Sequence, residues 1–472
     1  MRYILIIFSA FLVSFTVISC AIDELADKVT GSSSDDSSSD GSTGTYQLAT
    51  NDYANGVATD SSGNVYVTGG TKGGLDGNTS AGNTDLFVVK YNSSGTKEWT
   101  KQLGSSGRDS ANGITIDSSG NVYVTGVTFG GLDWNTSAGA NDLFVVKYNS
   151  SGTKQWTEQL GSESTDTANG VATDSSGNVY LAGVTYGGLD GNSNEDNADL
   201  FVVKYSSSGT KQWTKQLGTG EYDEARGVAT DSSGNVYLVG GTKGRLNGIS
   251  NSGRTDVFVI KFNSSGTRQW TKPLGTAQND LANGVSIDSS GNFYVAGVTY
   301  KDLDGNTSAG SADLFVAKYN SSGTKQWTKQ LGTSGRDHAR GVATDSSGNV
   351  FVAGDTYGGL DGNTNAGYND LFVVKYDSSG IKQWTKQLGT SSTDLANGVA
   401  TDSSGNVYVV GYTYGELDGN TNTGASDIFV VKYNSSGTKQ WTKQLGSSSP
   451  DYNYGRSNVL TQNTYKSIIS SN

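Results

Sequence analysis

The chain has very few of the residues that form disulfides or metal sites. Its 472 residues include one cysteine, Cys20, one histidine, His338, and two prolines. A single cysteine excludes a disulfide framework and a cysteine-based metal site. Helical periodicity is absent from nearly all of the chain after residue 30, whereas Gly, Val, Thr and Tyr are frequent. Because these residues favour short strands joined by tight turns, we expect an all-β fold.

The chain also lacks a surplus of positive charge. Its formal net charge is −12, which argues against nucleic acid as a partner because phosphate binding requires a basic surface. We expect an exposed, polar, monomeric domain that carries no cofactor.

The first 44 residues differ in composition from the rest. An apolar stretch, residues 3–18, leads to the sequence VISC, which ends at Cys20. The stretch is typical of a signal peptide and too short to span a membrane. VISC resembles a bacterial lipobox, which implies a lipoprotein signal peptide at residues 1–19, a lipid anchor on Cys20 and a place in the outer membrane. A plain secretory signal with an incidental cysteine is the alternative.

Residues 20–44 carry the sequence GSSSDDSSSDGSTG and almost no apolar side chains after the first few positions. Such a segment cannot bury enough apolar surface to fold, so we expect a lipidated N-terminus followed by a disordered tether.

One sequence is repeated seven times at a constant step of 57 residues. The phrase DSSGNVYV or a close variant begins at Asp60, Asp117, Asp174, Asp231, Asp288, Asp345 and Asp402. Seven of the eight tryptophans keep the same step: Trp99, Trp156, Trp213, Trp270, Trp327, Trp384 and Trp441. We assign residues 45–455 to one repeat domain and residues 456–472 to a C-terminal tail without a repeat partner.

Each repeat contains four strand candidates, which in the first repeat are residues 54–59, 64–69, 85–91 and 97–103. The sequences DSSGN and NSSGT join them as tight hairpin turns in which Gly supplies the positive φ. The third candidate, DLFVVKY, is apolar on both faces and must be covered on both. Seven such sheets around an axis predict a seven-bladed β-propeller of four-stranded antiparallel blades. A β-solenoid is the rival architecture.

The closure of this ring is ambiguous in the sequence. Residues 45–56 resemble a fourth strand and the loop that follows it, yet the last repeat has its own fourth strand at residues 439–445. One of the two copies must be redundant or displaced.

The sequences GVATDSSGNVYVTGGT and DLFVVKYNSSGTKEWTKQLG resemble the repeat of the seven-bladed β-propeller repeat family, SBBP, over residues 45–446. The resemblance implies the fold and a place in bacterial surface or secreted proteins. It implies no activity, because the family has no shared catalytic motif. Pro273 and Asn247 are among the few departures.

Antiparallel order places both tight turns on one face of the ring and the longer, more variable loops on the other, where function is expected. One position after a repeated Thr, the chain has Lys72, Phe129, Tyr186, Lys243, Tyr300, Tyr357 and Tyr414. These residues, with Trp134, which replaces a Gly, are our candidate ligand-binding residues, because aromatic rings stack on sugars and grip peptide side chains. Packing within their own loops is the alternative.

Evidence for a metal site or for catalysis is weak. Asp76, Asn78 and Asp85 offer oxygens for Ca²⁺, but Asx turns explain these residues more simply. An active site needs unlike groups that converge, whereas near-identical blades present the same groups seven times. His338, beside Asp337 and Arg340, and the acidic loop with Glu221, Asp223 and Glu224 have no catalytic partner in the sequence. We predict no metal and no catalytic residue.

These patterns predict a non-catalytic, membrane-anchored, extracytoplasmic module that binds glycan or protein ligands at several points. A purely structural envelope protein is the alternative, and an enzyme that acts on polysaccharide is the less favoured third possibility.

Overall fold

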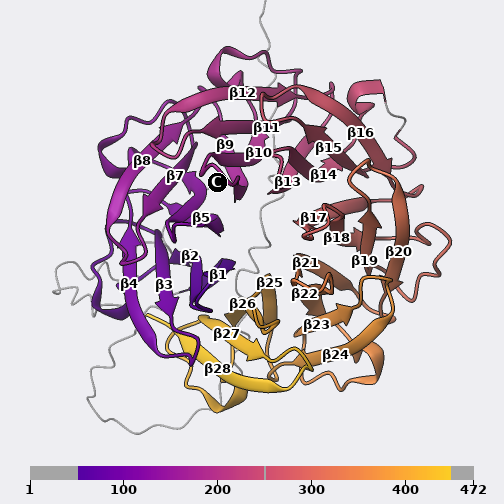
Figure 1. Cartoon of the computed structure of the whole chain (residues 1–472). Helices are drawn as coiled ribbons and strands as arrows, with labels where there is room; N and C mark the ends of the chain where they lie inside the picture. The colour runs from indigo at the N-terminus through magenta and orange to yellow at the C-terminus, as the bar shows by residue number, and fades with distance from the viewer. Residues whose placement is uncertain (1–50, 249–250, 448–472) are drawn as a thin grey trace, which may run out of the picture. The chain divides into compact units, whose positions relative to one another are not determined.

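The computed structural model describes residues 51–248 and 251–447. These residues form seven four-stranded antiparallel sheets, or blades, around a central axis (Figure 1). In every blade the spatial order of the strands is their chain order, with the first strand innermost (Figure 1). The predicted seven-bladed β-propeller is therefore confirmed. The signal peptide, Cys20, the tether and the C-terminal tail lie outside the described residues.

The strands repeat with nearly constant bounds. The first strands are β1 (Asp52–Thr59), β5 (Asp109–Ile116), β9 (Asp166–Thr173), β13 (Asp223–Thr230), β17 (Asp280–Ile287), β21 (Asp337–Thr344) and β25 (Asp394–Thr401). The second strands are β2 (Val65–Thr71), β6 (Val122–Thr128), β10 (Val179–Thr185), β14 (Val236–Thr242), β18 (Phe293–Thr299), β22 (Val350–Thr356) and β26 (Val407–Thr413).

The third strands are β3 (Asp85–Tyr91), β7 (Asp142–Tyr148), β11 (Asp199–Tyr205), β15 (Asp256–Phe262), β19 (Asp313–Tyr319), β23 (Asp370–Tyr376) and β27 (Asp427–Tyr433). The fourth strands are β4 (Lys97–Leu103), β8 (Lys154–Leu160), β12 (Lys211–Leu217), β16 (Arg268–Leu274), β20 (Lys325–Leu331), β24 (Lys382–Leu388) and β28 (Lys439–Leu445). Short 3₁₀ turns lie between the second and third strands: η1 (Leu75–Gly77), η2 (Leu132–Trp134), η3 (Leu189–Gly191), η4 (Leu246–Gly248), η5 (Leu360–Gly362) and η6 (Leu417–Gly419).

Both faces of every blade are buried, as the apolar third strands predict. Successive residues of a strand point to opposite faces of the sheet, so Val88 packs toward blade 2 while Phe87 and Val89 pack toward blade 7. Seven hydrophobic clusters result, one at each junction between neighbouring blades. No blade could bury its apolar side chains alone, so the ring is the folding unit.

The repeated tryptophan of the outermost strand lies between blades. Trp384 packs beside the blade 6–7 cluster of apolar residues, and its ring faces Gly437 in the hairpin turn of blade 7. A lysine of each third strand adds a hydrogen bond across most junctions, as where Lys375 Nζ donates to the Ser435 carbonyl at 2.9 Å. The tryptophans are therefore wedges within the frame.

A β-bulge in each innermost strand links the first strands around the axis. In blade 1 the extra residue is Asn55, between the pairs of Ala54 with Gly69 and of Gly56 with Thr68. Its amide donates to the Ala111 carbonyl of blade 2 at 2.9 Å. Five blades have Asn at the bulge and make this bond, whereas blades 4 and 6 have Arg226 and Arg340.

The ring closes with the C-terminal copy of the fourth strand. Blade 7 ends with β28, and Ser447, two residues after it, donates its backbone N–H to Asp52 Oδ2 at 2.6 Å and its hydroxyl to Asp52 Oδ1 at 3.0 Å. The Asp52 N–H also donates to the Ser426 carbonyl at 3.0 Å. The fourth strand of blade 7 is therefore the C-terminal copy, while the N-terminal copy contributes Asp52 and the start of β1; its residues before 51 lie outside the described part of the chain.

Buried aspartates hold the loops that join one blade to the next. Asp166 Oδ2 accepts hydrogen bonds from the backbone N–H of Ser162 at 2.6 Å and from its hydroxyl at 2.9 Å, while Oδ1 accepts from Thr185. The bond from a backbone N–H to Oδ2 recurs at Asp52, Asp109, Asp223, Asp280, Asp337 and Asp394. These residues are buried anchors of the loops.

The loop between the second and third strands turns outward and lies against the outermost strand of its own blade. Gln102 accepts a hydrogen bond from the Leu75 N–H at 3.0 Å and donates to the Gly73 carbonyl at 3.0 Å. Asp76 forms an ion pair with Lys97 and accepts from the Thr100 hydroxyl at 2.7 Å. The loop thereby covers the edge that a fourth strand would otherwise expose.

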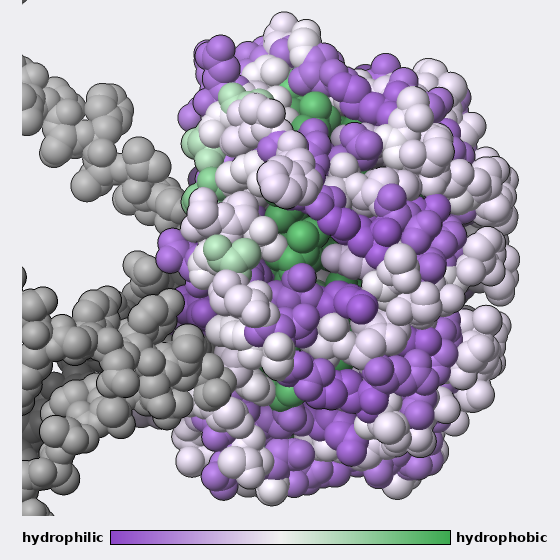
Figure 2. Space-filling view, turned by 90° about the vertical axis from the view of Figure 1, so that its left-hand side faces the viewer, coloured by the Kyte–Doolittle hydropathy of each residue, from purple (hydrophilic) through white to green (hydrophobic). Residues whose placement is uncertain are grey.

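The rim is polar over most of its area. Figure 2 shows hydrophobic residues exposed only in narrow areas between hydrophilic ones. Within residues 51–248 and 251–447, no helix is long and apolar enough to cross a membrane.

We predict that Gly437→Ala destabilises the ring more than Gly419→Ala. Both glycines have positive φ, 81° and 77°, so both substitutions introduce backbone strain of about 1–2 kcal/mol. Only at Gly437 would the new Cβ meet a neighbour, 2.9 Å from Trp384 Cδ2, whereas nothing lies within 4 Å at Gly419. Overpacking should add about 1–3 kcal/mol to the loss in the free energy of unfolding, measured by urea denaturation. Equal losses would show that the tryptophan wedge is not tightly packed.

We also predict that thermal stability is greatest at mildly acidic pH. Burial raises the pKa of Asp52, Asp166, Asp223, Asp280, Asp337 and Asp394. A raised folded-state pKa gives stability that is present below the unfolded value of about 3.9 and is lost as pH rises through the folded value.

A second set of aspartates acts in the opposite direction. Burial alone would raise the pKa of Asp76, but hydrogen bonds from Lys97 and Thr100 outweigh it and the pKa lies below its usual range. Asp190, Asp304, Asp361 and Asp418 behave likewise. Their stability is lost as pH falls through the folded value, so both sets together place the maximum melting temperature near about pH 4–5. A melting temperature that keeps rising to pH 8 would contradict this balance.

Candidate functional site

The two faces of the ring differ in how far they repeat. On one face, each DSSGN turn is closed by its own Asp: Asp60 Oδ1 accepts from the N–H groups of Ser62 and Asn64, both at 2.9 Å. Asp60 Oδ2 also accepts from the Tyr66 hydroxyl at 3.1 Å. The repeated phrase is thus a self-contained turn attached to a buried strand, which leaves the loop face as the place for a site.

The loop face carries the predicted ring of aromatic and lysine residues. Phe129, Tyr186, Tyr300, Tyr357 and Tyr414 are all exposed, by 37% to 48%, and Lys72 and Lys243 are exposed as well. Backbone hydrogen bonds fix the start of each loop, as where the Tyr414 N–H donates to the Thr393 carbonyl at 3.1 Å. The backbone at these positions is therefore held while the side chains face solvent.

Two members of this ring contact a further aromatic residue. The rings of Tyr186 and Tyr222 lie 6.4 Å apart, and Lys243 Nζ lies 5.4 Å from the centroid of the Tyr222 ring. Tyr222 is half-buried, and its hydroxyl donates a hydrogen bond to Glu224 at 3.1 Å. Tyr186 and Lys243 thus both contact a residue of the loop that joins blades 3 and 4.

Trp134 lies apart from the aromatic ring. It is 99% exposed and has a left-handed φ of 69°, at a position where the other blades have glycine. Asp133, directly before it, is ion-paired with Lys154 at the start of β8. Trp134 therefore belongs to the rim of blade 2, and the structure does not bring it together with the other candidate residues.

The oxygens considered for Ca²⁺ do not converge. Asp76 is bonded to Lys97 and Thr100 on the rim, and the Asn78 amide donates to the Leu75 carbonyl. Asp85 is fully buried, where its Oδ2 accepts from the Ala81 N–H at 2.7 Å and from Gln102 at 2.8 Å. No group of three or more His, Cys, Asp or Glu residues suited to a metal occurs in the described part of the chain.

Residues that break the repeat gather on the loop face where blades 6 and 7 meet. Arg340, the bulge residue of β21, donates from Nε to Asp355 Oδ1 at 2.6 Å, and Asn369 donates to Asp355 Oδ2 at 3.3 Å. The rings of Tyr412 and Tyr414 lie 5.8 Å apart. We refer to this group as the blade 6–7 site: Arg340, Asp355, Tyr357, Tyr368, Tyr412 and Tyr414.

The charges of this group are set by burial and by the ion pair. The Asp355 side chain is only 2% exposed and that of Arg340 is 34% exposed. Burial alone would lower the pKa of Arg340, but Asp355 outweighs it and the guanidinium stays charged. Burial raises the pKa of Tyr412 to about 12. The site therefore holds a charged Arg340 guanidinium beside a neutral Tyr412.

His338 borders the blade 6–7 site. It is directly paired with Asp355 across β21 and β22, its Nε2 is buried without a hydrogen-bond partner in the described residues, and burial lowers its pKa. The imidazole is therefore half-buried and neutral at the edge of the site.

Comparison of the repeats with one another contained the signal for this site. The position of Arg340 is Asn in five blades, and the position shared by Asp355 and Tyr412 is Gly or Val in the other five. From the sequence, Arg340 was recognised only as a neighbour of His338, and Asp355, Tyr368 and Tyr412 were not recognised as site residues. Comparing every position of the repeat across the seven blades, and not only the loop position after the repeated Thr, would have found them.

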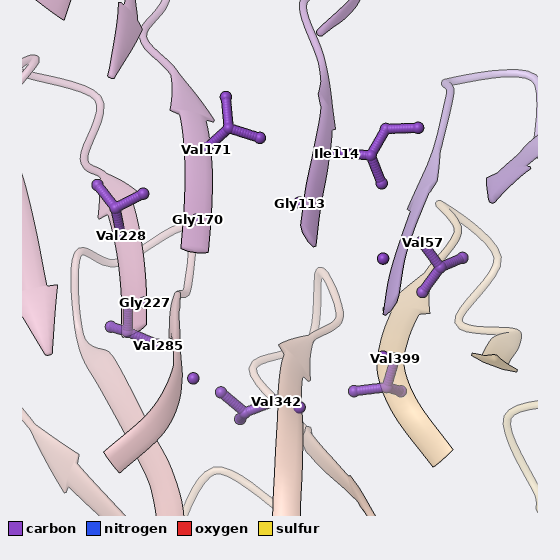
Figure 3. A pocket seen from close by; sticks show the side chains of 14 residues that line it. Val57, Gly113, Ile114, Gly170, Val171, Gly227, Val228, Val285, Val342 and Val399 are labelled. Atoms are coloured by element: carbon purple, nitrogen blue, oxygen red, sulfur yellow. The ribbon is translucent and has the colours of Figure 1, made fainter. Parts of the chain in front are cut away.

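A cavity of about 160 Å³ lies on the axis beneath the loop face. Gly and Val or Ile residues of the seven innermost strands line it, among them Gly341 and Val342, which follow Arg340. Figure 3 shows these apolar side chains arranged around the ring, each from a different innermost strand. The bulge residues stand directly before this apolar lining in the chain.

Two known proteins are similar to this chain at low identity. An uncharacterized WD repeat-containing protein of Acanthamoeba polyphaga mimivirus is 24% identical over 469 residues, which cover 73% of this chain and 34% of that protein. Regulatory protein FlaEY of Caulobacter vibrioides is 25% identical over 398 residues, covering 74% of this chain and 41% of that protein. The chain thus spans about a third and about two fifths of these relatives. Among solved structures, the WD40 β-propeller domain of Doa1 covers 77% of this chain and 93% of that chain at 11% identity, with a TM-score of 0.45.

The beta-propeller repeat model, SBBP, matches the chain seven times. The matched segments are residues 47–76, 98–133, 155–190, 212–247, 269–304, 326–361 and 383–418. Each of the last six runs from a fourth strand, through the first two strands of the next blade, into the loop that follows. Because these segments make up more than half of the chain, the protein belongs to the beta-propeller repeat family SBBP.

Proposed function

We propose that the protein is a non-catalytic binding module that uses the loop face of its propeller to hold glycan or protein ligands. The observation that carries this proposal is the exposure of five aromatic side chains, each 37% or more, around one face of a rigid ring. Exposed aromatic rings rarely occur in such an ordered set without a partner, and Tyr is well suited to contact both apolar and polar groups.

The ring geometry supports a ligand that repeats. Seven equivalent loop positions on one frame can engage several units of the same partner, and the second contact then forms at high effective concentration. The relatives include a protein named as regulatory, which is compatible with partner binding. The non-repeating residues described above add selectivity at one junction.

We further propose that the module is held at a membrane surface. The lipobox-like VISC sequence that ends at Cys20 and the Ser-rich, Asp-rich segment after it support a lipid anchor with a tether on an outer membrane. In this arrangement the propeller is displaced from the bilayer and its loop face is available to extracytoplasmic ligands.

The prediction for the loop face concerns its circle of exposed aromatic residues. Combined substitution of Tyr186, Tyr300 and Tyr357 by Ala should reduce binding to the ligands recovered by the wild-type chain on a glycan and protein array by about tenfold or more, because each truncation removes aromatic contact area. Ile381→Thr is the matched control: Ile381 is 62% exposed in a turn of the opposite face, where the six other blades have Thr. Binding unchanged in the tyrosine variant, or lost equally in the control, would favour a purely structural protein.

A separate prediction concerns the lipid anchor. Cys20→Ala should move the full chain from the membrane fraction to the soluble fraction of fractionated cells, because the acceptor thiol for the lipid is removed. Ser19→Ala, which keeps the thiol, should leave the protein in the membrane fraction. Retention of the Cys20 variant in membranes would contradict lipid anchoring.

A further inference from the structure

The blade 6–7 site consists of residues that the propeller does not need. Five blades build the same bulge with Asn, and five build the same part of the second strand with Gly or Val in place of Asp355 and Tyr412. Arg340 also gives up the bond that Asn makes to the next blade, since its Nε is committed to Asp355. Side chains that replace a working frame residue and break a frame bond point to a role outside the frame.

The Arg340 guanidinium is held in one orientation, but only one of its nitrogens takes part in a hydrogen bond within the described residues. Its Nε donates to Asp355, which is itself buried and also bonded to Asn369. Within the described residues, neither Nη1 nor Nη2 of Arg340 has a hydrogen-bond partner, and the side chain is 34% exposed. A guanidinium held on one side by a buried carboxylate presents its remaining N–H groups as a fork that fits a second, exposed carboxylate.

Arg226, the other bulge arginine, is more fully engaged. Its Nε donates to Glu224 at 3.0 Å and its Nη1 donates to Asn283 at 3.0 Å. Glu224 also accepts from Tyr222 and Asn169, so the side chains around Arg226 bond mainly to one another. Arg226 thus uses two of its nitrogens in hydrogen bonds and Arg340 only one, and in that sense we call the bulge of blade 4 closed and that of blade 6 open; both side chains are partly exposed, by 37% and 34%.

Two tyrosines lie near the open Arg340 side chain, and two more lie on the adjoining loops. Tyr357 and Tyr412 lie close enough to Arg340 to interact with it electrostatically. The loop of residues 390–394 runs between Tyr368, whose N–H donates to the Ser392 carbonyl, and Tyr414, whose N–H donates to the Thr393 carbonyl. Tyr368 is 74% exposed, Tyr357 48% and Tyr414 45%. The site therefore combines one directed positive charge with several accessible aromatic rings.

We propose that the blade 6–7 site binds a carboxylated sugar, with Nη1 and Nη2 of Arg340 on the carboxylate and the tyrosines against the pyranose ring. The proposal rests on the binding function proposed above and names the ligand class for one junction. A carboxylate needs a local cation on a chain of net charge −12, and Arg340, together with exposed Arg336 beside it, supplies this charge. The apolar C–H face of a pyranose matches the face of a tyrosine ring.

The carboxylate of a peptide C-terminus fits this site less well. Such termini are captured by free backbone N–H groups arranged as a nest. In the loop beside the site, the N–H of Thr390 donates to Asp394, that of Ser392 to the Thr390 hydroxyl and that of Asp394 to the Asn369 carbonyl. The charge at this site comes from a side chain.

The test is isothermal titration of the full chain with hexuronate oligosaccharides. Glucuronate, galacturonate and mannuronate tetrasaccharides are each compared with their methyl esters, in which the sugar rings are kept and the charge is removed. We expect at least one acid to bind about tenfold or more tightly than its ester, since charge-assisted hydrogen bonds are lost in the ester. A peptide with a free C-terminal carboxylate forms a further arm and is expected not to bind.

Three substitutions that restore the repeat supply matched variants. Arg340→Asn should abolish the preference for acid over ester, whereas Arg226→Asn, the same change at the closed bulge, should leave it intact. Tyr412→Val should weaken both acid and ester. Thermal melts check that every variant is folded. Because Arg340→Asn alone would leave the buried Asp355 without its partner, it is also combined with Asp355→Gly, so that both positions carry residues found in other blades.

The remaining outcomes overturn the proposal in distinguishable ways. Equal binding of acid and ester, an acid preference that survives Arg340→Asn, or binding of the peptide alone would disprove the carboxylated-sugar site. If array ligands still depend on the loop-face tyrosines, the proposed binding function would stand. If the tyrosine variant keeps its binding to the array ligands and to the acidic oligosaccharides, the proposed binding function and the carboxylated-sugar site would both be disproved.

Discussion

The packing of each blade against its two neighbours is the constraint on which the rest of the structure depends. A sheet whose third strand is apolar on both faces cannot be stable alone, and seven copies satisfy one another only when the ring is closed. The tryptophan wedge, the bulge asparagine and the buried aspartate all lie at this junction. The tryptophan and aspartate contacts recur at all seven junctions and the asparagine contact at five, so the sequence is held nearly constant where it builds them.

This constraint explains why the fold could be predicted from the sequence. The step of 57 residues, the paired Asx-Ser-Ser-Gly turns and the apolar third strand each constrain the architecture, and together they leave the propeller as the simplest solution. Two features were not predictable. The direction of the loop after the second strand depends on the contacts of Leu75 and Asp76 with Gln102 and Thr100 of the outer strand. The choice of closing strand depends on Ser447 and Asp52. Both features depend on contacts between particular residues, and a repeat pattern does not show which residues are in contact.

The candidate site could be predicted only in part. The column of aromatic residues that follows each second strand was visible in the sequence, and its exposure agrees with that reading. Trp134 lies instead on the rim, because the outward turn of the loop carries it there. The Arg340–Asp355 pair was missed because its members are far apart in the repeat and meet only through a bulge and a strand pairing. Departures from a repeated frame are thus the best guide to function in such a chain, since residues that maintain the frame are the same in every blade.

The equivalence of the seven junctions, including the one between the two ends of the chain, is the central claim of this account. It is tested most directly by comparing Asp52→Ala, at the closing junction, with Asp166→Ala, at an interior one, in urea denaturation. Both aspartates accept the same backbone and hydroxyl hydrogen bonds, from Ser447 and Ser162 respectively. The account predicts the same loss in the free energy of unfolding, about 1–3 kcal/mol for each. A loss for Asp166→Ala with none for Asp52→Ala would show that the ring is not closed between blades 7 and 1.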